Sequence, residues 1–264
     1  NTMNWNRAEF KEQAKLRFRR NYWPCVAVSV VLVLLGGGGS TMYNVASSNS
    51  GQGDIQDLYG ELSGQDPALV WTVLGILFGA LAVGGIISLV LRLLLCNPFE
   101  VGASRFYVEN RGRATSFGAV GAGFSRNFGN VVLTEFLRDL FVVLWSLLFI
   151  IPGIVKSFAY FAVPYILAEN PNPDHSRVLE LSRNMTRGWK GEIFVTYLSF
   201  ILWGLLSCIT LGIVGVFYAN PYLNATCAEM YAFLRQEALN NNIASAEELP
   251  GFGGAEDAAL PESL

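Results

Sequence analysis

The stretch LFVVLWSLLFII, residues 140–151, carries no charged side chain and ends directly before Pro152 and Gly153. Three more nearly uninterrupted apolar runs occur at residues 24–35, 68–91 and 193–201. Helices of soluble proteins place polar residues at shorter intervals, because only one of their faces is buried. These runs therefore predict helices that are surrounded by lipid.

The composition also indicates a membrane protein. Hydrophobic residues make up 52% of the 264 residues and charged residues 15%, whereas a soluble domain has about 25% charged residues. The net charge is −3 and the basic residues are dispersed, which argues against binding to nucleic acid. With one histidine and no nucleotide-binding or protease motif, the sequence predicts no metal, no cofactor and no catalytic residue.

The basic residues predict the orientation of the first two spans. Six Lys and Arg residues precede the span at 22–40, and Arg92, Arg105 and Arg111 lie in or follow the span at 68–96. The intervening loop, residues 41–67, has acidic residues but no Lys or Arg. Because basic residues favour the cytoplasmic side, we expect this loop outside the cell and the N-terminus inside.

The second half could contain two broken helices or two hairpins. Single spans would place residues 169–191, which are rich in Arg and Lys, outside the cell, against the rule for basic residues. Hairpins that turn at 152–153 and 210–212 leave every basic residue except Lys156 near the cytoplasmic side. The predicted fold is thus an all-α bundle with about six spans, at residues 22–40, 68–96, 133–151, 153–168, 193–209 and 212–234. The later helices are short, so tilted or re-entrant arrangements also remain open.

The hairpins resemble one another in sequence. LWSLL at 144–148 matches LWGLL at 202–206, and Asn97-Pro98-Phe99 matches Asn220-Pro221-Tyr222. The pattern predicts three repeated hairpins, each preceded by an amphipathic cytoplasmic segment, within a membrane domain at 3–239. Residues 240–264 are acidic and rich in small residues and predict a disordered cytoplasmic tail.

Several segments carry a family resemblance: Asn4-Trp5 with Arg7, Ala14-Lys15, NYW at 21–23, FEVGA at 99–103 with Arg105-Phe106, LWSLLFIIPGI at 144–154, VPYILA at 163–168 and NPY at 220–222. The chain is similar, over roughly residues 4–236, to a family of bacterial integral membrane proteins, domain of unknown function 975. This resemblance implies a multi-pass protein of the bacterial plasma membrane and supplies no activity. A looser similarity to membrane domains of glycerophosphodiester phosphodiesterases concerns their non-catalytic part alone.

Two groups of polar residues are candidates for a transport path or binding site. Glu135, Arg138 and Asp139 share one helical face near the start of the third predicted span. Asn220, Asn224 and Glu229 lie beside Pro221, where an interrupted helix can expose carbonyl groups. Ionisable residues in a membrane are costly and often functional. Mutual neutralisation and hydrogen bonds between helices are the structural alternatives.

Four further residues are expected at the lipid headgroups: Arg92, Lys156, Trp23 and Trp189. Arg92 would extend to the inner interface, and Lys156 would lie alone at an outer turn. Tryptophan prefers the membrane interface. The amphipathic segment at 100–113 is expected to lie along the cytoplasmic surface.

The leading functional hypothesis is a non-enzymatic protein that transports or exports a small molecule, a lipid or a peptide. The alternative is a structural or regulatory scaffold that oligomerises, remodels the bilayer or binds other membrane proteins. The expected partners are the lipid bilayer and, for the scaffold, further copies of the chain or other membrane proteins.

Overall fold

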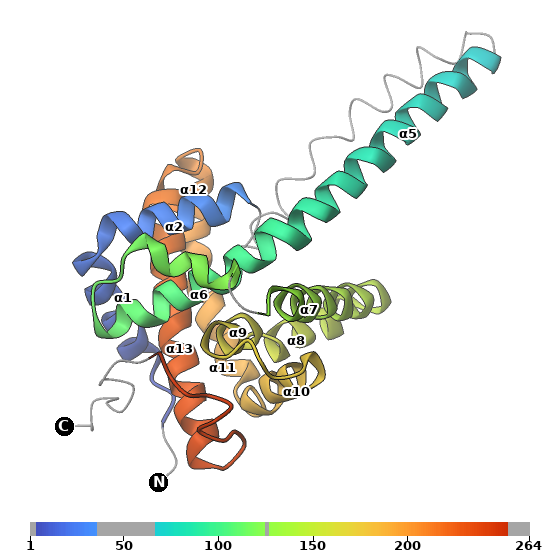
Figure 1. Cartoon of the computed structure of the whole chain (residues 1–264). Coiled ribbons are helices and arrows are strands. Elements are labelled where there is room, and N and C mark those ends of the chain that lie inside the picture. Colours follow the sequence, from blue (N-terminus) through green and yellow to red (C-terminus); the bar gives the residue numbers. More distant parts are fainter. Residues whose placement is uncertain (1–3, 36–66, 125–126, 253–264) are drawn as a thin grey trace.

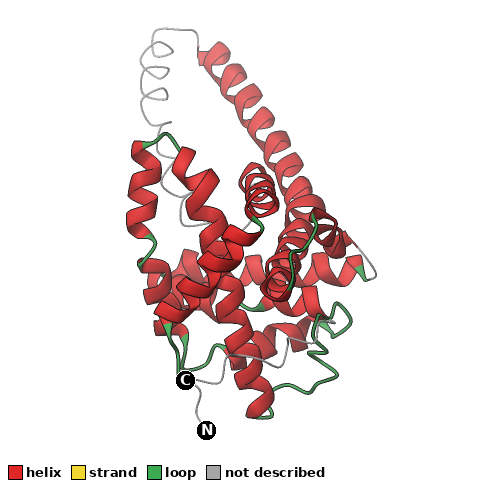
Figure 2. Cartoon of the chain, turned by 90° about the vertical axis from the view of Figure 1, so that its left-hand side faces the viewer, coloured by secondary structure: helices red, strands yellow, loops and turns green. Residues whose placement is uncertain are grey.

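The computed structural model describes residues 4–35, 67–124 and 127–252. Regular structure in these ranges is helical, as predicted, and they contain no strand (Figures 1 and 2). The elements are α1 (Arg7–Arg20), α2 (Tyr22–Leu34), α5 (Pro67–Leu91), the π-helix η2 (Arg92–Cys96), α6 (Asn97–Gly112), the 3₁₀ segment η3 (Phe117–Phe124), α7 (Phe128–Leu148), α8 (Ile150–Ala159), α9 (Val163–Glu169), α10 (His175–Met185), α11 (Lys190–Leu198), α12 (Ile201–Ile209), the π-helix η4 (Gly215–Ala219) and α13 (Asn220–Asn240).

Helix α13 lies at the centre of the packed body. Most of its side chains are buried, including Tyr231, Phe233 and Leu234. Helices α1, α2, α6 and α10 pack around it. The aromatic side chains bury large apolar areas here, which is the main driving force for such packing.

Helix α6 is part of this core and not of the membrane surface. Its side chains are buried along most of its length, and η3, α9 and α13 cover it. At Gly102 an added Cβ would lie 1.8 Å from the carbonyl oxygen of Val120, so only glycine allows this close approach of η3. The prediction that residues 100–113 lie along the cytoplasmic interface is therefore corrected.

Helix α5 extends away from the packed body (Figure 1). It has 25 residues, all uncharged. From Trp71 to Leu91 its side chains are exposed, apart from the half-buried Val73 and Leu74. A 25-residue helix is about 37 Å long, which exceeds the hydrocarbon core of a bilayer, about 30 Å.

Three helical segments in the described ranges are long and apolar enough to cross a membrane: Trp71–Gly112, Ile150–Glu169 and Lys190–Ile209. They overlap the predicted spans at 68–96, 153–168 and 193–209. Tyr22–Leu34 is a shorter apolar helix, and residues 36–40 of the first predicted span lie outside the described ranges. The predicted third and sixth spans are not among these segments.

Two of the Asn-Pro pairs, Asn97-Pro98 and Asn220-Pro221, each follow a short π-helix. Asn97 follows η2 and donates its backbone N–H to the carbonyl of Arg92, and Asn220 follows η4 and donates to Gly215. Each bond spans five residues instead of four. The widened turn lets the helix continue although Pro98 and Pro221 have no N–H to donate.

The chain reverses direction at two places near the predicted turns. Helix α7 ends at Leu148, and the extended residue Phe149 separates it from α8. The turn thus precedes the predicted position at Pro152-Gly153, because proline is tolerated in the first turn of a helix and here lies inside α8. At 210–212 the turn lies as predicted, with positive φ at Leu211 and Gly212.

Each reversal brings a serine against a glycine. A Cβ added at Gly153 would lie 2.1 Å from Ser146 Oγ, and one at Gly215 would lie 2.2 Å from Ser207 Oγ. Since only a residue without a Cβ fits, these glycines allow the two arms of each turn to pack closely.

The segment after α13 packs against the body through residue 252. Leu249 is buried, and Arg177 binds Glu248 with an Nε–Oε1 distance of 2.7 Å. The prediction of a disordered tail from residue 240 therefore does not hold for residues 241–252, where an ion pair and a buried leucine fix the chain. The remainder of the predicted tail lies outside the described residues.

Candidate functional site

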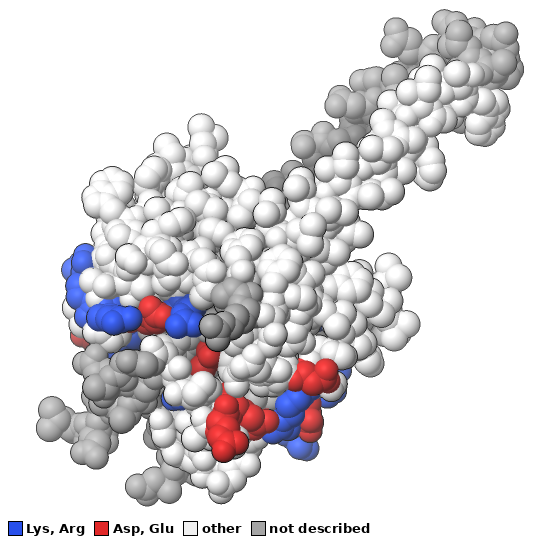
Figure 3. Space-filling view, viewed as in Figure 1, with Lys and Arg blue, Asp and Glu red and all other residues white. Residues whose placement is uncertain are grey.

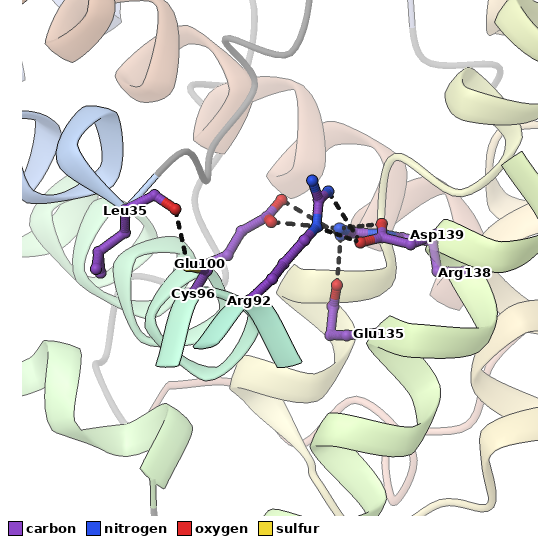
Figure 4. Close-up of polar contacts among 7 residues, drawn as sticks. All are labelled: Leu35, Arg92, Cys96, Glu100, Glu135, Arg138 and Asp139. Atoms are coloured by element: carbon purple, nitrogen blue, oxygen red, sulfur yellow. Dashed lines mark hydrogen bonds and ion pairs between the residues drawn. The ribbon is translucent and has the colours of Figure 1, made fainter. Parts of the chain in front are cut away.

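The first predicted polar group is assembled around Arg138 (Figure 4). Its guanidinium lies 2.6 Å from Glu135 Oε2, 3.2 Å from Glu100 Oε2 and 2.9 Å from Asp139 Oδ1. Arg92 joins the group by donating from Nε and Nη2 to Asp139 Oδ2, at 3.2 and 3.0 Å. We refer to Glu100, Arg92, Glu135, Arg138 and Asp139 as the Arg138 network.

Three elements supply the Arg138 network. The helical spacing of α7 places Glu135, Arg138 and Asp139 on one face, as predicted. Arg92 opens η2, and Glu100 lies in the first turn of α6. The network therefore connects α7 to the continuous helix that follows α5.

Glu135 has an unusual position in the network. Its side chain is fully buried, and its carboxylate oxygens accept no hydrogen bond although Arg138 is in ion-pair contact. The network contains three carboxyl groups but only two guanidinium groups. A buried carboxylate in this arrangement is the group that a proton would neutralise most readily.

Arg92, predicted at the inner interface, has a half-exposed side chain whose guanidinium binds Asp139. Sequence reasoning did not include Glu100 in the site. Glu100 and Arg138 are 38 residues apart, so no helical spacing connects them.

The second predicted polar group does not form one site. Glu229 is buried between Arg17 of α1 and Arg111 of α6, with a distance of 3.1 Å between Arg111 Nε and Glu229 Oε2. Asn224 donates to Ser29 Oγ at 3.4 Å, and Ser29 also shares a hydrogen bond of 2.7 Å with the hydroxyl of Tyr107. Asn220 begins α13 and is half-buried. These partners belong to α1, α2 and α6, whereas the Arg138 network belongs to α6, α7 and η2.

A third polar group was not predicted. The fully buried carboxylate of Glu169 accepts hydrogen bonds from Tyr231 Oη at 2.6 Å, Arg235 Nε at 2.8 Å and the backbone N–H of Gly251 at 2.6 Å. It connects α9 to α13 and to the C-terminal segment. Glu169 and Arg235 are 66 residues apart, so their pairing follows from tertiary packing alone.

The predicted interface residues have different surroundings. Trp23 is 71% exposed, which fits an interfacial position. Trp189 stacks on Trp5 with ring centroids 5.5 Å apart and contacts Phe233 edge-on, so it belongs to an aromatic cluster of the protein. This finding corrects its predicted position at the lipid headgroups.

Lys156 contacts an aromatic ring. Its ammonium nitrogen lies 4.9 Å from the centre of the Trp145 ring. The ammonium group of Lys156 therefore packs on the ring of Trp145 in α7.

The charged residues are unevenly distributed. On the face shown in Figure 3, Lys, Arg, Asp and Glu lie across the middle and lower part, while α5 and the end of the body formed by α12 carry none. Among the described residues, no cluster of His, Cys, Asp or Glu is arranged to hold a metal ion. The geometry thus provides buried ion pairs on one side and a large uncharged surface on the other.

Residues 148–238 match the model of a family described as protein of unknown function (DUF975). This match confirms the resemblance over that range, from the end of α7 to the last turn of α13. The Arg138 network precedes the matched range, whereas Glu169, Glu229 and Arg235 lie within it. No curated protein and no solved structure matches the chain.

Proposed function

We propose that this chain is a non-enzymatic scaffold of the bacterial plasma membrane. It would be anchored by α5 and by the uncharged ends of its hairpins, and it would associate with further copies through α5. The observation that carries the proposal is the internal pairing of the polar groups that a transport path would need.

The paired residues include most of the candidates for a path. Arg138 contacts three carboxylates, Glu229 contacts two arginines, and Asn224 contacts Ser29. Breaking a buried ion pair leaves an uncompensated charge and strongly destabilises a protein, so these pairs would keep the helices in one arrangement. A side chain that must bind and release a solute needs partners that can be exchanged.

The uncharged surface supports the membrane anchor. Large apolar side chains are exposed along α5 and at the ends of α7, α8 and α12. A continuous exposed apolar surface of this kind in a soluble protein would lead to aggregation. In a bilayer the same surface is covered by acyl chains.

We further propose that the membrane domain consists of three related hairpins with both termini in the cytoplasm. The π-helix before Asn97-Pro98 and before Asn220-Pro221, and the serine–glycine contact in the second and third hairpins, support a common origin. The charged lower side in Figure 3 would face the cytoplasm. A fold with six complete spans would in addition require the second and third hairpins to cross the bilayer.

Self-association would involve the glycine-rich face of α5. At Gly75 and Gly79 an added Cβ would meet no described residue within 4 Å, and the two glycines lie one turn apart. Small residues at this spacing let two membrane helices approach closely. A second copy would therefore pack against this face.

Transport remains a second candidate because of Glu135. Its buried carboxylate accepts no hydrogen bond, and the network has one more carboxyl than guanidinium group. Such a group could bind a proton or a cation in the membrane. Transport then requires that Glu135 become accessible to water during a cycle.

Energy transfer between labelled copies in liposomes tests the scaffold. We expect transfer that persists when lipid dilutes the protein, that decreases in Gly79→Leu, and that is unchanged in Gly191→Leu, where the glycine is exposed on α11. Proton and potassium flux are measured on the same liposomes. Monomers at high dilution, together with a flux that Glu135→Gln abolishes, would establish the second candidate instead.

A further inference from the structure

The uncharged part of the second hairpin is short. Residues 140–155 have no charged side chain and lie between Asp139 and Lys156. Asp139 is held in the Arg138 network, and the Lys156 ammonium lies 4.9 Å from the centre of the Trp145 ring. The uncharged stretch is therefore bounded by a charged side chain at each end, and its middle extends away from them.

The third hairpin has a similar limit. The Lys11 ammonium lies 4.6 Å from the centre of the Phe200 ring, where α11 ends and α12 follows. Phe200 also contacts Tyr222 of the returning arm, with ring centroids 5.1 Å apart. A charged side chain thus contacts the middle of this hairpin, and only α12, the turn at 210–212 and η4 extend beyond it.

These lengths can be compared with the bilayer. Phe149 lies ten residues beyond Asp139, and Leu211 lies eleven residues beyond Phe200. At 1.5 Å per residue the two ends extend about 15 and 16 Å, which is half of a hydrocarbon core of about 30 Å. Helix α5, in contrast, is long enough to cross completely.

The two later candidate spans are shorter in space than their residue numbers indicate. The segment 150–169 is divided at Tyr160, and every residue of its second helix, α9, is buried in protein. The segment 190–209 is divided at Ser199–Phe200. Only α8 and α12 are left to contact lipid deep in the membrane.

The exposed side chains at the two turns are apolar, which does not suit the outer surface of a membrane. The residues that end the second hairpin, Leu147, Phe149, Ile150 and Ile151, are at least 66% exposed, and Leu211 of the third is 93% exposed. A turn that had crossed would place these side chains in the headgroups or in water. Their exposure is favourable only inside the hydrocarbon.

The polar groups of the third turn are satisfied within the turn itself. The Gly212 N–H donates to the Ser207 carbonyl at 2.7 Å, and the Thr210 hydroxyl donates to the Leu206 carbonyl at 3.0 Å. In the second hairpin, Ser146 Oγ donates to the Val142 carbonyl at 2.7 Å. Such internal bonds are required where no water is available.

We propose that the second and third hairpins enter the leaflet on the charged side and end near the middle of the bilayer, while α5 crosses it. The partner of these hairpin ends is the acyl-chain region of that one leaflet. Two wedges in a single leaflet would locally thin or bend the membrane. This inference rests on the proposed membrane anchor and specifies its depth.

Single cysteines test the depth. In a background with Cys96→Ser and Cys208→Ser, which keeps the buried Cys25 and Cys227, labels are placed by Ile150→Cys and Leu211→Cys. Ser48→Cys, in the loop predicted outside, and Asn241→Cys, after α13, are the controls. Membrane-impermeant maleimide is applied from either side, and spin labels report oxygen against nickel-complex accessibility in nanodiscs of phosphatidylethanolamine and phosphatidylglycerol.

We expect both hairpin ends to be unreactive from either side and to have the highest ratio of oxygen to nickel accessibility, as at the bilayer centre. Labelling of both ends from the side that labels Ser48→Cys would show complete crossing and overturn the inference. Labelling from the side of Asn241→Cys would show that the ends do not enter the membrane, which also overturns it. If only the two controls differed from expectation, with each labelled from the opposite side, the proposed orientation would be reversed. The inferred depth of the hairpin ends would not change.

Discussion

Arg138 is the residue on which the polar interior of α7 depends. It is the direct partner of three carboxylates, one of them the fully buried Glu135. Removing one member of a buried ion pair leaves an uncompensated charge, which costs about 3–5 kcal/mol. The residues of the Arg138 network therefore have unequal importance for stability.

Arg138→Leu should lower the free energy of unfolding by about 3–5 kcal/mol, because Glu135 and Glu100 lose their shared counter-charge. Arg183→Leu, at an exposed position on α10, is the matched control and should change little. Chemical unfolding in detergent, followed by circular dichroism, measures both. An equal effect of the two substitutions would contradict a structural role for the Arg138 network.

Glu135→Gln should destabilise the protein much less than Arg138→Leu. The substitution removes a carboxylate that accepts no hydrogen bond and leaves two carboxylates with two guanidinium groups. The same unfolding measurement applies. A loss as large as that of Arg138→Leu would mean that the Glu135 charge itself holds the network together.

Glycine contacts determine how the helical elements pair. Gly153→Ala places a Cβ 2.1 Å from Ser146 Oγ and 2.6 Å from its Cα, so α7 and α8 must separate. Overpacking of this kind costs about 1–3 kcal/mol. Gly191→Ala, where a Cβ meets nothing within 4 Å, should be neutral or slightly stabilising. Thermal unfolding of the two variants would show no difference if the close contact were unimportant.

Docking of the C-terminal segment should depend on pH. Hydrogen bonds from Arg177 hold the pKa of Glu248 below its usual value. The pKa of Glu248 is lower in the docked state than in the undocked state, where it is about 4.3. The ion pair therefore stabilises docking at pH values above the undocked pKa, and this contribution is lost as the pH falls through the docked pKa. The distance between spin labels at Arg183→Cys and Ala246→Cys should lengthen below about pH 4.

The matched control for this pH dependence is Glu248→Gln. In this variant the distance between the two spin labels should indicate weaker docking, and it should no longer change over the pH range in which Glu248 takes up a proton. A wild-type distance that stays constant down to about pH 3, below the usual carboxyl range, would show that the buried Leu249 and the Glu169 contacts hold the segment without the ion pair.

Elements and local spacings could be predicted from the sequence, whereas long-range pairs could not. The turn at 210–212 and the shared face of Glu135, Arg138 and Asp139 follow from local chemistry. The bonds Arg92–Asp139 and Arg235–Glu169 join residues 47 and 66 positions apart. Such pairs depend on how helices pack, and the charge of each residue alone does not indicate its partner.

The burial of α6 could not be predicted for the same reason. Its segment has an amphipathic composition that suits a membrane surface as well as a protein core. The contact of Gly102 with the Val120 carbonyl decides between the two, and that contact joins two elements whose approach no local pattern indicates.

At the scale of the whole molecule, the charged side chains of the body are separated from the apolar hairpin ends and from α5. Charged side chains lie on one side, and α5 extends well past the rest of the protein (Figures 1 and 3). This division supports an anchor in the bilayer with a paired, rigid interior. A protein anchored through a wide apolar surface would need a body that stays closed. The internal pairing of the ionisable groups would keep it closed.

The most direct test of this account is an electron cryomicroscopy structure of the full chain in a lipid nanodisc, with a bound antibody fragment to assist alignment. The account predicts lipid density around all of α5, hairpin ends at Phe149 and Leu211 near the disc midplane, and an interior without water around Glu135. A water-filled passage that joins Glu135 to the outer surface would contradict the scaffold and establish a transport path.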